Sequence, residues 1–163
     1  MKLKNIWQFI KFAIVGVANT LVDWLVFYLL VFFVMPDGKL SAKAISFVVA
    51  VINSFILNSI WTFRAEFYSG IKDKNLKFYR IGTYFIRFFI VSLVGFVINY
   101  FTFRWVIFNI AGTSLANYAN IASLVSASGA ALVWNFVINK FWTYKTAGEE
   151  ELSAEEQKHK VVM

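Results

Sequence analysis

The chain has few residues from which a reactive centre could be built. It contains no cysteine, one proline and one histidine, and charged residues occupy only 15% of its 163 positions. The absence of cysteine excludes disulfides and thiolate metal sites, and the one histidine, His159, lies in a polar C-terminal stretch. No nucleophile with its base, metal-ligand cluster or phosphate-cradling glycine loop is recognisable. We therefore expect a protein that is not an enzyme and that needs no metal or other cofactor.

Apolar residues are abundant instead. Hydrophobic side chains account for 60% of the chain and aromatic side chains for 20%, and the mean hydropathy is +0.64. Water-soluble domains of this size carry fewer apolar and more charged residues. The composition therefore indicates an integral membrane protein.

Four apolar segments reach the length of about 20 residues that a membrane-spanning helix needs. Backbone groups in lipid must be hydrogen-bonded internally, and four segments without a period of two could not close a barrel. The predicted fold is therefore all-α, with short connections at 36–38 and 111–114 that make two helical hairpins. We expect a transmembrane domain over residues 1–147 and a polar, disordered cytoplasmic tail over 148–163. The expected spans are about 12–35, 40–63, 88–110 and 118–142.

Most basic residues fall on one side of the predicted membrane. Thirteen of the 16 precede the first span, lie near the middle loop or follow the core of the fourth span, whereas Lys39 and Lys43 lie on the other side. The positive-inside rule then places both termini and the middle loop in the cytoplasm. Since this topology accounts for the net charge of +7, we do not expect nucleic-acid binding. The 13 residues are Lys2, Lys4, Lys11, Arg64, Lys72, Lys74, Lys77, Arg80, Arg87, Lys140, Lys145, Lys158 and Lys160.

Two stretches before the first and third spans, at 6–11 and 76–87, mix aromatic, aliphatic and basic residues. This composition is typical of interfacial helices that lie along the membrane surface and continue into a span. It is equally typical of the cytoplasmic start of a long, tilted span. The sequence leaves both interpretations open.

The pattern N-x-x-W-T-[FY]-[RK] occurs twice, at Asn58–Arg64 and Asn139–Lys145, 81 positions apart. A weaker match relates Val15-Gly16 in the first span to Val94-Gly95 in the third. Because both hairpins begin on the cytoplasmic side, they are expected to be parallel repeats. Such repeats are related by a pseudo-two-fold axis along the membrane normal.

The motif ends in aromatic and basic residues. We expect Trp61 and Trp142, with Phe63 and Tyr144, at the cytoplasmic interface, where aromatic belts need no further function. The basic residues directly beyond them are also candidates to hold a lipid phosphate.

Asp23 is the most informative polar residue within a span. It lies about 17 Å beyond Phe12, near the middle of the membrane, and Asn19 shares its helix face. An ionisable group in lipid must be paired, protonated or face a wet cavity, and such groups often mark transport paths. Alternatively, Asp23 hydrogen-bonds another helix and has a purely structural role.

Arg104 is the candidate partner of Asp23. It lies about 9 Å from the outer end of the third span, so it is shallower than Asp23. Its guanidinium could pair with Asp23, extend outward to the interface, or bind an anionic headgroup.

The second and fourth spans carry amides and small residues. Asn135 and Asn139 share a helix face, whereas Asn53 and Asn58 align less well. These amides could bind sugar hydroxyls or phosphate oxygens, or they could tie helices together. Small residues spaced by four indicate helix packing within the bundle or between protomers of a homo-oligomer. They are Ser46, Ala50 and Ser54, then Ala122, Ser126 and Ala130, and finally Ser123, Ala127 and Ala131.

Two segments resemble the GtrA-like family. They are FAIVGVANTLVD at 12–23 and NSFILNSIWTF at 53–63, and the resemblance extends over roughly residues 8–146. Two departures are Asn53, shifted by one place from the match to Asn135, and Phe103 or Arg104 where the first half has Asp23 and Trp24. The positions that match the family's motifs are Gly16, Asn19, Asp23, Asn58, Trp61, Asn135, Asn139 and Trp142.

The resemblance implies a small, multi-pass protein of the bacterial inner membrane that acts in cell-surface polysaccharide synthesis. Members are linked to O-antigen or teichoic acid glycosylation and are thought to flip a sugar linked to a polyprenyl phosphate such as undecaprenyl phosphate. Some work beside a membrane glycosyltransferase. The expected partners are therefore this lipid-linked sugar, membrane lipid and such a glycosyltransferase.

The expected function is translocation of this lipid from the cytoplasmic to the outer leaflet, with the headgroup in a polar groove and the prenyl chain in lipid. One alternative is a non-transporting subunit that anchors or organises a glycosyltransferase, and another is a proton-coupled exporter of small cations. Trp61 and Trp142 are the expected interfacial aromatics. The residues expected to contact the lipid phosphate or sugar are Asn19, Asp23, Asn58, Arg64, Arg87, Arg104, Asn135, Asn139 and Lys145.

Overall fold

The computed structural model describes residues 3–71, 76–110, 113 and 116–145, and all regular structure in these residues is helical. Four of the helices are long and apolar enough to cross a membrane. The all-α prediction with four spans is confirmed, and the protein is a multi-pass membrane protein. The tail expected over 148–163 lies outside the described residues.

The described residues form two compact units. The first comprises 3–71, 76–82 and 144–145, and the second comprises 83–110, 113 and 116–143. Each unit contains one of the hairpins that the sequence predicts.

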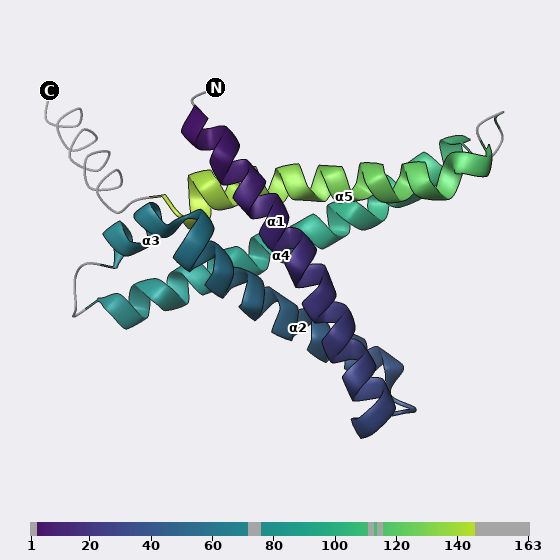
Figure 1. The fold of residues 1–163 in the computed structure, drawn as a ribbon, viewed down its shortest axis with the longest axis horizontal. Coiled ribbons are helices and arrows are strands. Elements are labelled where there is room, and N and C mark those ends of the chain that lie inside the picture. Colours follow the sequence, from purple (N-terminus) through teal and green to yellow (C-terminus); the bar gives the residue numbers. More distant parts are fainter. Residues whose placement is uncertain (1–2, 72–75, 111–112, 114–115, 146–163) are drawn as a thin grey trace, which may run out of the picture. The chain divides into compact units, whose positions relative to one another are not determined.

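The first hairpin consists of α1 (Leu3–Leu29) and α2 (Lys39–Leu57), which run antiparallel and pack against each other (Figure 1). Each helix ends in a wider π-helical turn, η1 (Leu30–Val34) after α1 and η2 (Asn58–Thr62) after α2. A short helix that the sequence did not reveal, α3 (Arg64–Gly70), follows η2.

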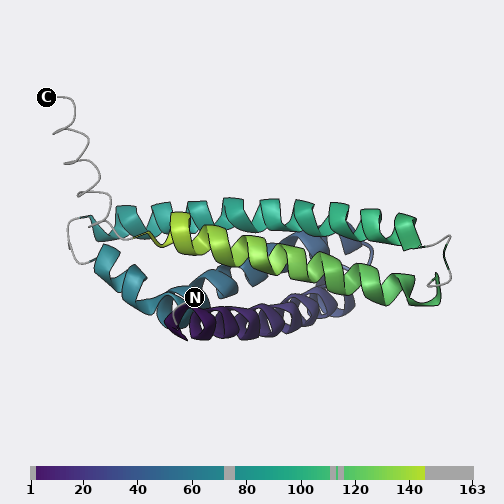
Figure 2. The same cartoon turned by 90° about the horizontal axis from the view of Figure 1, so that it is seen from above.

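The second hairpin consists of α4 (Lys77–Ile110) and α5 (Ala119–Ile138), which lie side by side in Figures 1 and 2. The 3-10 turn η3 (Ala116–Tyr118) precedes α5, and the π-helical η4 (Asn139–Thr143) follows it.

α1 and α4 begin well before the apolar spans expected from about 12 and 88. The amphipathic stretches at 6–11 and 77–87 belong to the same unbroken helices as the spans. Continuity satisfies every backbone group within the helix, as lipid requires.

Aromatic residues form the core at one end of the first unit. Phe63 stacks on Tyr144 with ring centroids 4.5 Å apart, and Phe12 meets Phe63 edge-on at 6.0 Å. Phe67 lies against both Phe55 and Tyr144. Phe63 and Tyr144, which were expected at the cytoplasmic interface, are both 0% exposed, so they pack against other side chains and not against lipid headgroups.

Four of the nine small residues predicted to pack are buried, whereas Ser126 is exposed. Ser46 and Ala50 of α2 are buried, as are Ser123 and Ala127 of α5. Small side chains at this spacing let helix backbones approach closely.

The predicted topology can be tested by cysteine labelling, since the chain contains no cysteine of its own. Lys77 begins α4 and Lys39 begins α2, and both are exposed. A membrane-impermeant maleimide should label Lys39→Cys in intact cells, but label Lys77→Cys only after permeabilisation. The opposite pattern would reverse the topology.

Candidate functional site: polar groups within the hairpins

The repeated motif ends each hairpin with the same local structure. In both copies it forms a π-helical turn, η2 or η4. The backbone N–H of Phe63 donates to the carbonyl of Asn58, five residues earlier, at 2.8 Å. The motif asparagine donates from Nδ2 to the carbonyl one turn before it, at 2.9 Å for Asn58 to Ser54 and at 2.8 Å for Asn139 to Asn135. π-Helical turns are rare and occur often at functional sites.

Each motif also buries two oxygen atoms that have no hydrogen-bond partner within the described residues. They are Oδ1 of Asn58 and Oγ1 of Thr62 in η2, and Oδ1 of Asn139 and Oγ1 of Thr143 in η4. All four residues are at most 6% exposed. An unpaired buried oxygen costs about 1–3 kcal/mol, so a hydroxyl donor that reached these atoms would relieve that cost. Asn58 and Asn139 were expected site residues, whereas the threonines were overlooked despite their place in the motif.

Each motif tryptophan lies under a cation from the preceding helix of its hairpin. Lys11 Nζ is 5.5 Å from the ring centre of Trp61, and the Arg87 guanidinium is 5.7 Å from that of Trp142. Arg87 also donates to the carbonyl of Trp142 at 3.2 Å. These contacts orient the two half-exposed tryptophans. Lys11 was not among the expected site residues.

The burial pattern aligns the sequences of the two halves differently from the match of Val15-Gly16 with Val94-Gly95. Positions 8, 12 and 15 are buried in α1, and positions 84, 88 and 91, each 76 residues later, are buried in α4. The cations Lys11 and Arg87 obey the same spacing. Asn99, not Phe103 or Arg104, is then the counterpart of Asp23.

Gly95 provides space for Asn135 in the second hairpin. A Cβ atom added at Gly95 would lie 2.5 Å from Asn135 Nδ2 and 2.6 Å from Oδ1. That Oδ1 is buried and has no partner within the described residues. The indole N–H of the neighbouring Trp134 donates to the carbonyl of Val91 at 3.3 Å, which holds the two helices together.

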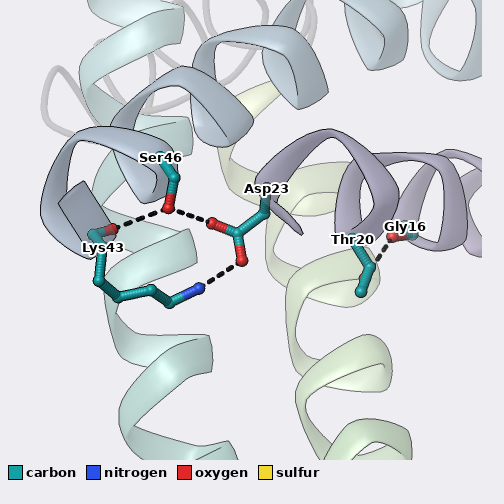
Figure 3. A network of polar contacts seen from close by, with 5 residues as sticks. All are labelled: Gly16, Thr20, Asp23, Lys43 and Ser46. Carbon is teal, nitrogen blue, oxygen red and sulfur yellow. Dashed lines mark hydrogen bonds and ion pairs between the residues drawn. The ribbon is translucent and has the colours of Figure 1, made fainter. Parts of the chain in front are cut away.

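Asp23 lies at the centre of the most polar contact in the first hairpin (Figure 3). Ser46 Oγ donates to Asp23 Oδ1 at 2.7 Å, and Lys43 Nζ forms an ion pair with Oδ2. Asn19 lies one turn before Asp23 on α1, and its Oδ1 accepts a hydrogen bond from the amide of Asn53 on α2 at 3.4 Å. Asn19 and Asp23 thus both reach α2, as their shared face predicts.

Arg104 was the partner considered for Asp23, but the cation paired with Asp23 in the described part of the chain is Lys43. Arg104 is exposed, and its guanidinium lies 5.0 Å from the ring centre of Phe108. An arginine over an aromatic ring near the end of a span is consistent with the second possibility considered above, a side chain that extends outward to the interface.

Two exposed cations, Arg64 and Lys145, follow the motif copies. Arg64, Ala65 and Tyr68 line a shallow, open depression of about 440 Å³, and the Arg64 guanidinium lies 5.9 Å from the Tyr68 ring centre. Beside it, the buried Gln8 donates from Nε2 to the carbonyl of Thr62 and to Glu66, both at 3.1 Å. Gln8 was not predicted, because one amide among apolar residues near a helix start carries no distinctive signal.

The polar residues of the first hairpin together form a ladder along it. From Thr62 to Lys43, α2 and η2 rise about 28 Å at 1.5 Å per residue, close to the roughly 30 Å of a bilayer's hydrocarbon core. We call this set the polar ladder. Its members are Gln8, Asn19 and Asp23 from α1, and Lys43, Ser46, Asn53, Asn58 and Thr62 from α2 and η2.

In the described part of the chain, no group of three His, Cys, Asp or Glu side chains could hold a metal ion. The polar ladder instead offers amides, hydroxyls and one ion pair. These groups can bind a polar, anionic or hydroxyl-rich ligand through hydrogen bonds.

Four apolar helices with polar groups along their length define a small polytopic membrane protein. Residues 11–144 match the family described as "GtrA/DPMS, transmembrane domain", and the chain belongs to this family. The resemblance found in the sequence is thereby confirmed. The chain is also 28% identical over 134 residues to a protein described as "Uncharacterized membrane protein YngA" from Bacillus subtilis (strain 168), covering 82% of this chain and 77% of that protein. Membership supports involvement in processes that concern polyprenyl-phosphate sugars, in a family of generally non-catalytic membrane proteins.

The close approach at Gly95 yields a stability prediction. Gly95→Ala should lower the free energy of unfolding by about 1–3 kcal/mol, because its Cβ would overlap Asn135. Gly129→Ala in α5 is the matched control, since nothing lies within 4 Å of a Cβ there. Thermal unfolding in detergent measures both variants.

The double variant Gly95→Ala/Asn135→Ala separates a local overlap from a general loss of helix packing. Removing the Asn135 amide should recover part of the lost stability. The spatial role of Gly95 is refuted if Gly95→Ala melts at the same temperature as Gly129→Ala.

Proposed function

We propose that the protein translocates a polyprenyl-phosphate-linked sugar from the cytoplasmic to the outer leaflet of the bacterial inner membrane. There the sugar is used to glycosylate a cell-surface polymer such as O-antigen or teichoic acid. The polar ladder is the observation that carries this proposal. Family membership supports the class of lipid.

The physical problem in such transport is the headgroup. Phosphate and sugar hydroxyls lose their hydration in hydrocarbon, and every group left unpaired there costs several kcal/mol. Hydrogen-bonding groups spaced along a hairpin replace that hydration step by step. The prenyl chain needs no such help, because it stays in lipid throughout.

In the proposed path, the lipid phosphate first meets the exposed cations at the cytoplasmic end, Arg64 and Lys145. The depression beside Arg64 supports this assignment. The buried acceptor oxygens of Asn58 and Thr62 then receive sugar hydroxyls, which supply the donors that those oxygens lack. Asn19 and Asp23 follow at successively greater depth.

The second hairpin is proposed to contribute the corresponding acceptors of its own motif, Asn139 and Thr143, together with Asn135. In this proposal Arg87 orients Trp142 beside the lipid phosphate, and Arg104 receives an anionic headgroup near the outer interface.

The transport step needs no covalent chemistry. A facilitator moves lipid down its gradient, and consumption of the lipid in the outer leaflet drives net flow.

The alternative, a non-transporting subunit that anchors a glycosyltransferase, needs a packing surface for its partner. The small-residue face of α2 provides little support, since Ser46 and Ala50 are buried within this chain. Under an anchoring role, Asp23 would serve only to join α1 to α2 through Ser46 and Lys43.

Transport can be measured in vesicles that contain the purified protein and a labelled polyprenyl-phosphate sugar. Asp23→Asn should slow the appearance of the sugar at the opposite surface by about tenfold or more, since it removes the ladder's carboxylate. Asp37→Asn is the matched control, because Asp37 lies in the exposed turn after η1 and should keep the wild-type rate.

Wild-type protein that fails to accelerate sugar exposure over protein-free vesicles would rule out transport. If Asp23→Asn supports glycosylation in cells as well as wild type does, the anchoring alternative is favoured instead.

A further inference from the structure

The two partners of the ion pair at Asp23 are anchored very differently. Asp23 accepts a hydrogen bond from Ser46, which is 0% exposed, and the Asp23 side chain is 18% exposed. The Lys43 side chain is 52% exposed, and its ammonium has the Asp23 carboxylate and the face of Phe27, 6.0 Å away, as its contacts. In Figure 3 the lysine side chain extends from α2 to the carboxylate on α1. The carboxylate is therefore fixed, whereas the ammonium can leave.

Lys43 also occupies a distinctive place on the hairpin. It lies four residues after Lys39, about 6 Å into α2 and on the side that the predicted topology assigns to the outer leaflet. A lysine at this depth can extend its aliphatic stem through lipid while its ammonium reaches the headgroup region. It can therefore alternate between a partner inside the hairpin and a partner at the membrane surface.

We propose that Lys43 is a phosphate-binding residue at the outer end of the polar ladder, and that Asp23 competes with the phosphate for its ammonium. Lys43 leaves Asp23 to bind the arriving lipid phosphate and returns to Asp23 when the lipid departs. This proposal rests on the transport function above and names the group that releases the substrate.

Exchange between two anions makes such a step easy. The ammonium keeps an anionic partner before and after the exchange, so no cation is left unpaired in a medium of low dielectric constant. The carboxylate retains the Ser46 hydroxyl while Lys43 is away. Two neighbouring anions then repel each other, which favours departure of the phosphate. A lysine suits this role, because its ammonium is a compact charge on a flexible stem and does not form the paired contact that arginine makes.

Competition predicts opposite effects of removing the two charges. Lys43→Gln should weaken phosphate binding by about tenfold, the usual worth of a hydrogen bond to a charged group. Asp23→Asn should strengthen it by a similar factor, because the ammonium no longer has a carboxylate to return to. In transport, both variants should be slow, the first through weak capture and the second through slow release.

Binding is measured by calorimetric titration of the full-length protein in nanodiscs, independently of transport. The probes are a short-chain prenyl phosphate, the prenol of the same chain length, inorganic phosphate, and an anionic phospholipid. Wild-type protein should prefer the prenyl phosphate to the prenol, and Lys43→Gln should lose that preference. Preference for inorganic phosphate or for the phospholipid over the prenyl phosphate would overturn a site for the lipid-linked substrate.

Lys39→Gln is the matched control, since it makes the same change one turn earlier and should bind as wild type does. Lys43→Arg keeps the charge and should retain most of the binding, which separates loss of charge from misfolding. The proposal is overturned if Lys39→Gln and Lys43→Gln weaken binding equally, or if Asp23→Asn weakens it as Lys43→Gln does.

The same measurements distinguish failure of this site from failure of the transport function. Transport by the wild type that is insensitive to Lys43→Gln would overturn the site and leave the function standing. Phosphate binding with the expected variant pattern, but without transport by the wild type, would support the site and overturn the function.

Discussion

The cost of an unpaired polar group in hydrocarbon governs this structure. Lipid cannot hydrate an amide, a hydroxyl or a carboxylate. Each such group must therefore be hydrogen-bonded within the protein or to a bound ligand. Asp23 shows the first solution, because Ser46 and Lys43 occupy its two oxygens. The motif shows the second solution. Nδ2 of Asn58 and of Asn139 donates to a carbonyl of its own helix, while Oδ1 has no partner within the described residues.

The polar side chains of the motif lie in the π-helical turns η2 and η4. The carbonyls of Ser54 and Asn135 each accept from the backbone N–H and from the side-chain amide of the motif asparagine four residues later. The threonine four residues after the asparagine lies at the end of that turn, with its hydroxyl buried. Each copy of the motif thus places a buried asparagine at the start of the turn and a buried threonine at its end. The turn itself does not require the motif, because the apolar η1 has the same form.

The two hairpins share this ending but differ along the spans that lead to it. At the structural register of the repeat, Asn19 corresponds to Gly95 and Asp23 to Asn99. The first hairpin therefore carries a charged pair where the second has only an amide and a close helix contact. Both hairpins thus offer hydrogen-bond acceptors in their motifs. Only the first offers an ion pair, Asp23 with Lys43, whose lysine can exchange partners.

Much of this was determined by the sequence alone. Long apolar segments define spanning helices because lipid demands internal hydrogen bonds, so the all-α fold and the four spans were recognisable from the four apolar segments. The family was recognisable from residues 12–23 and 53–63. The importance of Asp23 was also predictable, since a carboxylate in a span is costly wherever it points. The partner of Asp23 was not predictable. Arg104 and Lys43 are both basic residues near the outer side, and the sequence does not reveal which of them reaches the carboxylate.

Only the tertiary structure could decide how side chains pack across a hairpin. Phe63 and Tyr144 have the composition of an interfacial belt, yet they stack inside the first unit. Gln8 joins α1 to η2 and α3 through contacts with residues 54 and 58 positions later. Local sequence fixes the period and length of a helix through its own hydrogen bonds, whereas helix rotation and side-chain partners depend on neighbours that only the folded chain brings together.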